Sequence, residues 1–236
     1  MFTLHQPSDW APACAVFDCD GILLDSEKLW GQVQAQMFKH YQLDLTPQLE
    51  ASLVGVSAGD LADRIANLSP LKSSHPGGPS TFRDSVYQQI TSTEFDIISQ
   101  GVQAIDGALE LVKLLSSKIP VAVASNSGRD LLTKKLTSFG FDQHLSTWVS
   151  FHDVPAGKPA PDIYLEAVRR LGFSPDQALT VEDSITGMKA ATGAGTHCLI
   201  YRPQPSPSQL EEAGIGWTSS FTDPAFLAQV DRWLGQ

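Results

Sequence analysis

Cysteine is scarce in this sequence, and its placement argues against two common uses. The chain has three cysteines among 236 residues, at positions 14, 19 and 198. Their odd number and the lack of a C-x-x-C pair argue against a disulfide framework and a zinc site of paired cysteines. Because free thiols persist in a reducing compartment, we expect a cytoplasmic protein.

Long apolar runs and a surplus of positive charge are also missing. No apolar run reaches the roughly 18 residues that a membrane-spanning helix needs. Residues 1–13 lack the basic region and apolar stretch of a secretory signal. The formal net charge is −10, and a broadly anionic surface repels nucleic acids and anionic lipids. We therefore expect no nucleic-acid or membrane partners, and we expect any anionic substrate to be held by a local site or a metal ion. We also expect a monomer.

Short apolar runs alternate with helical patterns over most of the chain. The runs typical of strands buried on both faces are residues 14–17, 121–124, 178–181 and 198–201. Helical periodicity occupies residues 107–118, 129–139 and 162–171. This alternation predicts an α/β fold, a Rossmann-like parallel sheet with helices on both faces.

Residues 28–99 interrupt the alternation with helical patterns alone. Leu29, Val33, Met37 and Tyr41 recur at every fourth position and form one face of a helix. Further helices are expected near residues 46–53, 58–67 and 82–99. We therefore predict an α/β core of residues 1–27 and 100–236, with an inserted helical bundle of residues 28–99.

Polar residues follow three of the predicted strands. They are Asp18 and Asp20 after the first, Ser125 and Asn126 after the second, and Glu182 and Asp183 after the third, with Lys158 in an intervening loop. Singly, each suits a turn, a helix cap or a solvated side chain. A calcium loop does not fit, because its sixth and twelfth positions counted from Asp18 hold Leu23 and Leu29. Ligands bind beyond the carboxyl ends of parallel strands, so together these residues predict one site.

The side chains of this predicted site suit phosphoryl transfer. Carboxylates can hold Mg²⁺, which binds oxygen ligands and pairs with phosphate. One carboxylate can attack phosphorus, and a second can protonate the leaving alcohol and then deprotonate water. Hydroxyl, amide and backbone N–H groups at a helix start can bind phosphate oxygens, and a lysine can neutralise the developing charge.

Four motifs extend this interpretation to a known family. FDCDGILLDSE, ASNS, GKPAPDIY and VEDSITGMKAA occur in this order along the chain. The sequence thereby resembles the haloacid dehalogenase superfamily of phosphatases, in the branch that contains β-phosphoglucomutase. The helical insert of residues 28–99 falls where that branch carries its cap domain.

The resemblance implies a role for each motif residue of the core. Asp18 would be the nucleophile that forms an aspartyl-phosphate, and Asp20 the general acid and base. Ser125 and Lys158 would bind the phosphoryl group, with Asn126 beside them, and the Lys158–Pro159 peptide bond would be cis. Mg²⁺ would be bound by Asp18, the backbone carbonyl of Asp20, Glu182 and Asp183. Dehalogenation is disfavoured, because dehalogenases of the family lack an acid/base aspartate at the position of Asp20.

Within the predicted cap, the resemblance to the mutase is incomplete. The segment LVGVSAGD, residues 53–60, resembles the mutase segment that holds a bisphosphate. However, Ala58, Val54 and Trp30 stand where the mutase has arginine, lysine and histidine. A second phosphate group needs such cations. We therefore expect a phosphatase acting on a small phosphorylated metabolite, a sugar or polyol phosphate.

Three residues are expected to face the substrate, namely Glu27 at the end of the predicted core segment, and Trp30 and Gly55 in the predicted cap. Two alternatives stay open. The protein could be a phosphosugar mutase in which Arg64, Lys72 or Arg83 binds the distal phosphate. It could also be a non-catalytic binding or regulatory module, because a fold does not prove activity.

Overall fold

The structure is a computed structural model, and it describes residues 1–5, 10–53, 56–202 and 215–235. The chain divides into two compact units: Met1–Asp25 together with Ala104–Gln236, and Ser26–Gln103. The predicted boundaries, after residue 27 and before residue 100, lie a few residues from these limits.

Seven strands of the described chain form one sheet in the first unit. They are β1 (Phe2–Leu4), β2 (Cys14–Phe17), β3 (Val121–Ser125), β4 (Thr147–Ser150), β5 (Ala178–Glu182), β6 (His197–Tyr201) and β7 (Gly216–Thr218). Their order is β1-β7-β6-β5-β2-β3-β4. Every neighbouring pair is parallel except β1 and β7. The predicted α/β fold with a parallel sheet is confirmed, and β2 lies inside the sheet between β3 and β5.

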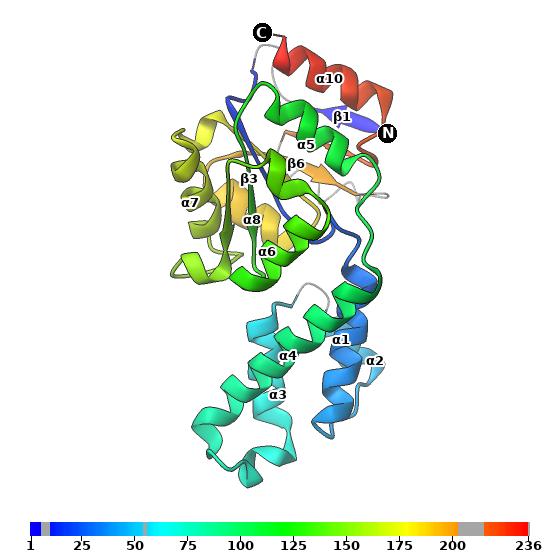
Figure 1. Cartoon of the computed structure of the whole chain (residues 1–236), viewed down its shortest axis with the longest axis vertical. Coiled ribbons are helices and arrows are strands. Elements are labelled where there is room, and N and C mark those ends of the chain that lie inside the picture. The colour runs from blue at the N-terminus through cyan, green and yellow to red at the C-terminus, as the bar shows by residue number, and fades with distance from the viewer. Residues whose placement is uncertain (6–9, 54–55, 203–214, 236) are drawn as a thin grey trace. The chain divides into compact units, whose positions relative to one another are not determined.

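The helices of the first unit cover both faces of the sheet. They are α5 (Ala108–Ser116), α6 (Arg129–Ser138), α7 (Asp162–Leu171), α8 (Ile185–Gly193) and α10 (Pro224–Leu234), with short 3-10 segments at Phe141–His144, Phe151–Asp153 and Pro175–Gln177. Helices α7 and α8 share a buried cluster with alternate residues of the strands, including Cys14 and Val16. Helices α5 and α6 pack from the opposite face (Figure 1).

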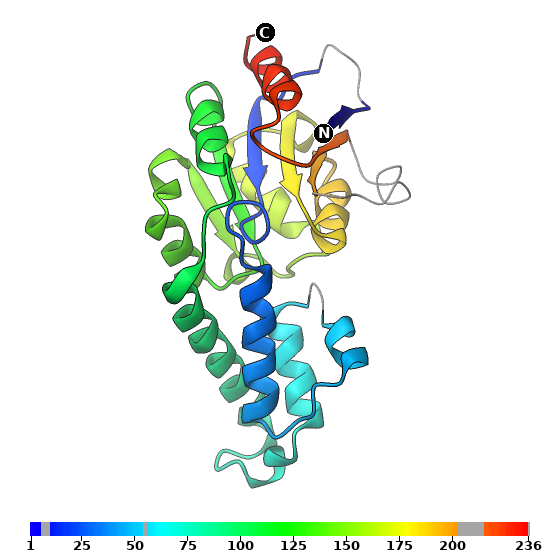
Figure 2. The ribbon, with the colours of Figure 1, turned by 90° about the vertical axis from the view of Figure 1, so that its right-hand side faces the viewer.

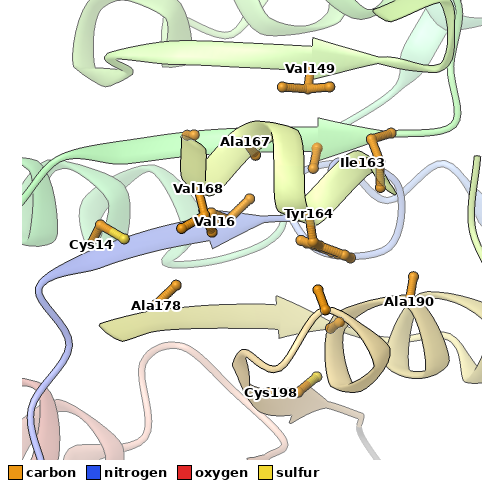
Figure 3. Packing of buried hydrophobic residues seen from close by; sticks show 14 of the residues in the cluster. Cys14, Val16, Val149, Ile163, Tyr164, Ala167, Val168, Ala178, Ala190 and Cys198 are labelled. Atoms are coloured by element: carbon orange, nitrogen blue, oxygen red, sulfur yellow. The ribbon is translucent and has the colours of Figure 1, made fainter. Parts of the chain in front are cut away.

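The cluster under α7 brings a polar group to the end of the sheet. Val168 lies beside Val16 of β2, while Tyr164 lies near the carboxyl ends of β2 and β5 (Figure 3). Both side chains are buried. The spacing of four residues places them on the same face of α7, so the packing of this helix fixes where the Tyr164 hydroxyl points.

In its described residues, the second unit has helices as its regular secondary structure. It contains α1 (Glu27–His40), α2 (Pro47–Ser52), α3 (Ala58–Leu68), a 3-10 segment (Pro70–Ser74) and α4 (Pro79–Gly101). Helices α1 and α3 both pack against α4, and the three run side by side in Figures 1 and 2. The predicted helix face is confirmed, since Val33, Met37 and Tyr41 are buried in the core of this unit and Leu29 packs against it. In the part of the chain that the structure describes, no helix has the length and apolar character to cross a membrane.

Candidate active site

The polar residues predicted for the core meet at the carboxyl edge of the sheet. Asp18 follows β2, Ser125 ends β3 and Glu182 ends β5. Because β3 and β5 flank β2 in parallel, these three strand ends share one edge. The Nζ atom of Lys158, from the loop before α7, lies 2.7 Å from Oδ1 of Asp18 and 2.6 Å from Oε1 of Glu182. The fold therefore joins three of the predicted segments through a single ammonium group.

This ammonium group and its two carboxylates are removed from water. The exposed side-chain fractions are 5% for Lys158, 11% for Asp18 and 0% for Glu182. Burial raises the pKa of Asp18 from 3.8 to about 7, although Lys158 opposes the rise. Burial alone would lower the pKa of Lys158, but Asp18 and Glu182 raise it above its ordinary value. One cation between two buried carboxylates leaves an excess of negative charge, which a further cation would offset.

Glu182 is held on both of its carboxylate oxygens. Oε1 accepts hydrogen bonds from Lys158 and from the Tyr164 hydroxyl, the latter at 2.5 Å. Oε2 accepts from the backbone N–H groups of Asp183 and Ser184 and from the Ser184 hydroxyl. Burial and Glu182 raise the pKa of Tyr164 well above its ordinary value, so the hydroxyl stays a donor. Glu182 thus acts as a fixed anchor for Lys158.

An acidic group able to hold a metal ion lies beside this anchor. Asp18, Glu182 and Asp183 each offer a carboxylate oxygen, and these oxygens lie within 4.8 Å of one another. Oxygen donors at this spacing are the ligands that Mg²⁺ takes in proteins, so the donor set fits that ion. The backbone carbonyl of Asp183 accepts a hydrogen bond from Arg202 at 2.8 Å.

Gly21 leaves room for the Asp183 carboxylate. A Cβ atom at position 21 would lie 1.9 Å from Oδ2 of Asp183. Gly21 also has φ +81, a left-handed conformation that side chains disfavour. Both the close approach of the Asp183 carboxylate and the left-handed backbone conformation therefore favour glycine at position 21.

Asp20 is paired with Lys135, a residue that the sequence reasoning missed. Nζ of Lys135 lies 2.8 Å from Oδ1 and 2.9 Å from Oδ2 of Asp20. The Ser127 hydroxyl donates to Oδ2 of Asp20 at 3.2 Å. Lys135 lies on the face of α6 that also carries Leu131, Leu132 and Leu136, all buried. A lysine at a core-facing position of a helix was the signal in the sequence.

Asn126 contacts the backbone of Lys158 through both of its amide atoms. Oδ1 accepts from the Lys158 N–H at 2.9 Å, and Nδ2 donates to the Lys158 carbonyl at 3.2 Å. The predicted cis conformation of the Lys158–Pro159 bond is confirmed. Gly157 permits the close approach, since a Cβ there would lie 2.6 Å from Oδ1 of Asn126. Asn126 therefore places Lys158, while Ser125 is buried with its Oγ accepting from the Ser127 N–H.

Comparison with known proteins identifies the family. The profile described as "Haloacid dehalogenase-like hydrolase" matches residues 15–201. The match includes every residue of the candidate active site described above apart from Arg202. The chain belongs to the haloacid dehalogenase-like hydrolases.

Similar proteins of this hydrolase family include named phosphatases. The chain is 31% identical to a probable pseudouridine-5'-phosphatase of Drosophila melanogaster, over 82% of this chain and 83% of that protein. It is 27% identical to hexitol phosphatase B of Escherichia coli K12, over 79% and 82% of the two chains. These names describe the relatives. They suggest which phosphate esters to test as substrates of this chain.

Solved structures share the fold of this hydrolase at low sequence identity. CbbY from Rhodobacter sphaeroides, crystallised with xylulose-1,5-bisphosphate, has a TM-score of 0.77 at 21% identity, covering 93% of this chain and 99% of that chain. β-Phosphoglucomutase from Clostridium difficile has a TM-score of 0.74 at 18% identity, covering 94% and 97%. The superfamily resemblance inferred from the four motifs is confirmed.

The three residues predicted to face the substrate, Glu27, Trp30 and Gly55, belong to the second unit. Gly55, together with Val54, lies outside the described residues, and so does the side chain of Glu27. Trp30 is half-buried and packs against the core of the second unit. A role for these residues at the substrate stays a prediction.

Proposed function

We propose that this hydrolase is a Mg²⁺-dependent phosphatase that cleaves a small phosphorylated metabolite, a sugar or polyol phosphate, through an aspartyl-phosphate. The observation that carries the proposal is the position of Asp18, buried at a strand end with Lys158 at 2.7 Å. A buried carboxylate beside a fixed ammonium group is suited to attack a phosphoryl group whose charge the ammonium offsets. Membership of the hydrolase family and the phosphatase names of the relatives support it.

Two displacements at phosphorus make up the proposed reaction. In the first, a carboxylate oxygen of Asp18 forms a bond to phosphorus as the bond to the substrate oxygen breaks, and Asp20 gives its proton to that oxygen. In the second, Asp20 takes a proton from water as the water oxygen attacks phosphorus, which releases inorganic phosphate and restores Asp18. Acid and base catalysis by one residue in successive steps suits a carboxyl group placed two residues from the nucleophile.

The acidic group of Asp18, Glu182 and Asp183 would hold the metal ion unequally. Both Glu182 oxygens already accept hydrogen bonds, so we assign direct binding to Asp18, Asp183 and the Asp20 carbonyl. Glu182 would support the site by holding Lys158. When bound, Mg²⁺ would neutralise charge on the phosphoryl oxygens.

Phosphate binding would involve the start of α6. Ser125 ends β3, and backbone N–H groups of the turn that follows it precede the helix, where anions are favoured. We assign the phosphate contacts to Ser125, Lys158 and these N–H groups. Asn126 would take part by placing Lys158, because both of its amide atoms are engaged there.

Contacts within the second unit favour hydrolysis over mutase activity. Arg64 donates to the carbonyl and hydroxyl of Ser52, and Arg83 is paired with Asp63. Two of the three cations that a mutase could use for a distal phosphate are thus engaged in their own unit. We propose that this unit serves as a cap whose residues Glu27, Trp30 and Gly55 face the substrate. The three cysteines are free and buried, which supports a cytoplasmic location as part of the proposal.

Phosphorus NMR in the presence of Mg²⁺ tests this function. The panel contains hexitol phosphates, hexose phosphates, pseudouridine 5'-phosphate and the general substrate p-nitrophenyl phosphate, without any bisphosphate primer. Steady growth of inorganic phosphate is expected, and β-glucose 1-phosphate should give little or no glucose 6-phosphate. Isomerisation faster than phosphate release would favour the mutase. No turnover of any phosphate ester by the folded protein would favour the non-catalytic module.

A further inference from the structure

Lys135 is a lysine whose side chain is wholly removed from solvent. Its exposed side-chain fraction is 0%, and it lies in the seventh position of α6 among buried leucines. A buried ammonium group is costly unless charged or polar partners surround it. A leucine or methionine would fill this position with less cost, so the presence of lysine calls for a purpose beyond packing.

Lys135 contacts Asp20, the proposed acid/base residue, and Ser127. Its Nζ atom contacts both oxygens of Asp20, at 2.8 and 2.9 Å, and the Ser127 hydroxyl at 3.0 Å. The Ser127 hydroxyl in turn donates to Oδ2 of Asp20 at 3.2 Å. Asp20, Ser127 and Lys135 thus form a closed triangle of hydrogen bonds.

The triangle determines the orientation of a carboxylate that is otherwise accessible. The Asp20 side chain is 36% exposed, compared with 11% for Asp18. A carboxylate at that exposure is free to rotate unless its oxygens are bonded. Proton transfer requires the donor oxygen to stay within hydrogen-bond reach of the reacting oxygen. Lys135 can keep hold of one Asp20 oxygen while the other transfers the proton.

We propose that Lys135 is a positioning residue that acts through Asp20, holding its carboxylate in the orientation that serves the leaving alcohol and then the attacking water. The inference rests on the proposed phosphatase function. It gives α6, a helix that begins after the ASNS motif and contains no residue of the four motifs, an influence on proton transfer. Ser127 contributes to the same positioning of the Asp20 carboxylate.

Kinetics of single and double variants test the inference. Lys135→Met keeps most of the length of the side chain and removes the ammonium group. We expect it to lower kcat for an alkyl phosphate about 10–100-fold, with KM changed less than about threefold, because orientation matters in the transition state. In an Asp20→Asn background the same substitution should change kcat less than about twofold, since the residue through which it acts is gone. Lys134→Met, the neighbouring lysine of the same helix, is the matched control and should keep kcat within about twofold.

A change of leaving group provides a second test, because a purely structural role of Lys135 would not make the effect of its substitution depend on the leaving group. Nitrophenolate needs no proton, so p-nitrophenyl phosphate bypasses Asp20 in the first step only. Lys135→Met should then show a rapid burst of nitrophenolate followed by slow turnover, because the water step still needs Asp20. Ser127→Ala is a milder change and should reduce kcat for an alkyl phosphate a few-fold. If Lys135→Met does not fold, Ser127→Ala still tests the inference.

The outcomes separate this inference from the function on which it rests. Unchanged kcat in both Lys135→Met and Ser127→Ala, or equal losses with and without Asp20, would overturn the positioning role alone. A wild-type protein without phosphatase activity, or full activity of Asp20→Asn, would overturn the proposed function and the inference together.

Discussion

Nζ of Lys158 lies 2.7 Å from Oδ1 of Asp18, although 140 positions separate the two residues in the sequence. The same atom contacts Glu182, which Tyr164 holds from the buried side of the sheet. The position of the ammonium group is therefore set by β2, β5 and α7 together. The proposed nucleophile, held in this way, can meet a phosphoryl group with little rearrangement.

Glu182 and Asp183 are predicted to differ in their importance for metal binding. Asp183→Asn should weaken Mg²⁺ binding by about 100-fold, because it alters a direct ligand, and Glu182→Gln by about 10-fold or less. Glu182→Gln should instead lower the free energy of unfolding by about 3 kcal/mol, since it breaks a buried ion pair with Lys158. Mg²⁺ titration calorimetry and urea unfolding measure the two effects. Equal losses of Mg²⁺ affinity would contradict the assignment.

Gly187 is predicted to be intolerant of alanine although it lies inside a helix. A Cβ atom there would lie within 2.0 Å of the Glu182 carboxylate atoms. Gly187→Ala should therefore lower the free energy of unfolding by about 1–3 kcal/mol and reduce kcat. From helix propensity alone, the same change would stabilise α8 by about 1 kcal/mol.

Gly193, also in α8, provides the matched control for this prediction. A Cβ atom at that position would have only Pro161 nearby, at 3.8 Å. Gly193→Ala should leave kcat unchanged and keep or slightly raise the free energy of unfolding. Similar behaviour of the two alanine variants in urea unfolding would show that the Glu182 carboxylate can move aside without cost.

Glu166 is predicted to make stability depend on pH through its two arginine partners. Its carboxylate accepts hydrogen bonds from Arg169 and Arg170, each at 2.7 Å, and Arg169 first and then Arg170 lower its pKa from 4.5 to about 2. A lowered pKa in the folded state stabilises the fold above pH 4.5, and this contribution is lost as the pH falls toward 2.

The Glu166→Gln variant measures that contribution. Because the pairs are near the surface, screening reduces the expected loss of unfolding free energy at pH 7 to about 1 kcal/mol. The difference from wild type should shrink steadily between pH 4.5 and pH 2 in urea unfolding experiments. Glu110→Gln, which removes an exposed carboxylate of the same unit, should differ from wild type by about 0.5 kcal/mol at most. A Glu166→Gln difference that does not depend on pH would contradict the ion-pair explanation.

The sequence predicted the strands that are buried on both faces and missed those at the margins. Residues 14–17 form β2 as expected, because a continuous apolar run has no polar face to expose. The missed strands are β1, β4 and β7. β1 and β4 are the edge strands, while β1 and β7 have three residues each, so hydrophobic patterning is weak there.

The site was predictable where residues follow strands and less so where helices contribute. Asp18, Ser125 and Glu182 share an edge because parallel strands end together, which the chain order reveals. Lys135 and Tyr164 reach the site from helices, and their direction depends on how α6 and α7 pack on the sheet. Helical periodicity identifies the buried face of each helix. It does not show which polar side chain on that face forms a hydrogen bond. The roles of these residues in catalysis stay predictions.

Substitutions of the two aspartates are predicted to reduce turnover to different extents. Asp18→Asn should abolish turnover, because an amide is a poor nucleophile and a poor Mg²⁺ ligand. Asp20→Asn should slow turnover by about 10²–10⁴-fold, the usual contribution of a general acid and base. Removal of Mg²⁺ with EDTA should stop phosphate release by the wild type and the residual phosphate release by Asp20→Asn.

The most direct measurement traps the phosphorylated enzyme. The Asp20→Asn variant is mixed with Mg²⁺ and p-nitrophenyl phosphate labelled with radioactive phosphorus, and it is quenched in acid within milliseconds to seconds. We predict label on the protein in an acid-stable, alkali-labile form, located by peptide mapping at Asp18, and no label when Asp18→Asn is added. Turnover without any protein-bound label, or label that persists in the Asp18→Asn variant, would contradict the role of Asp18 as the nucleophile.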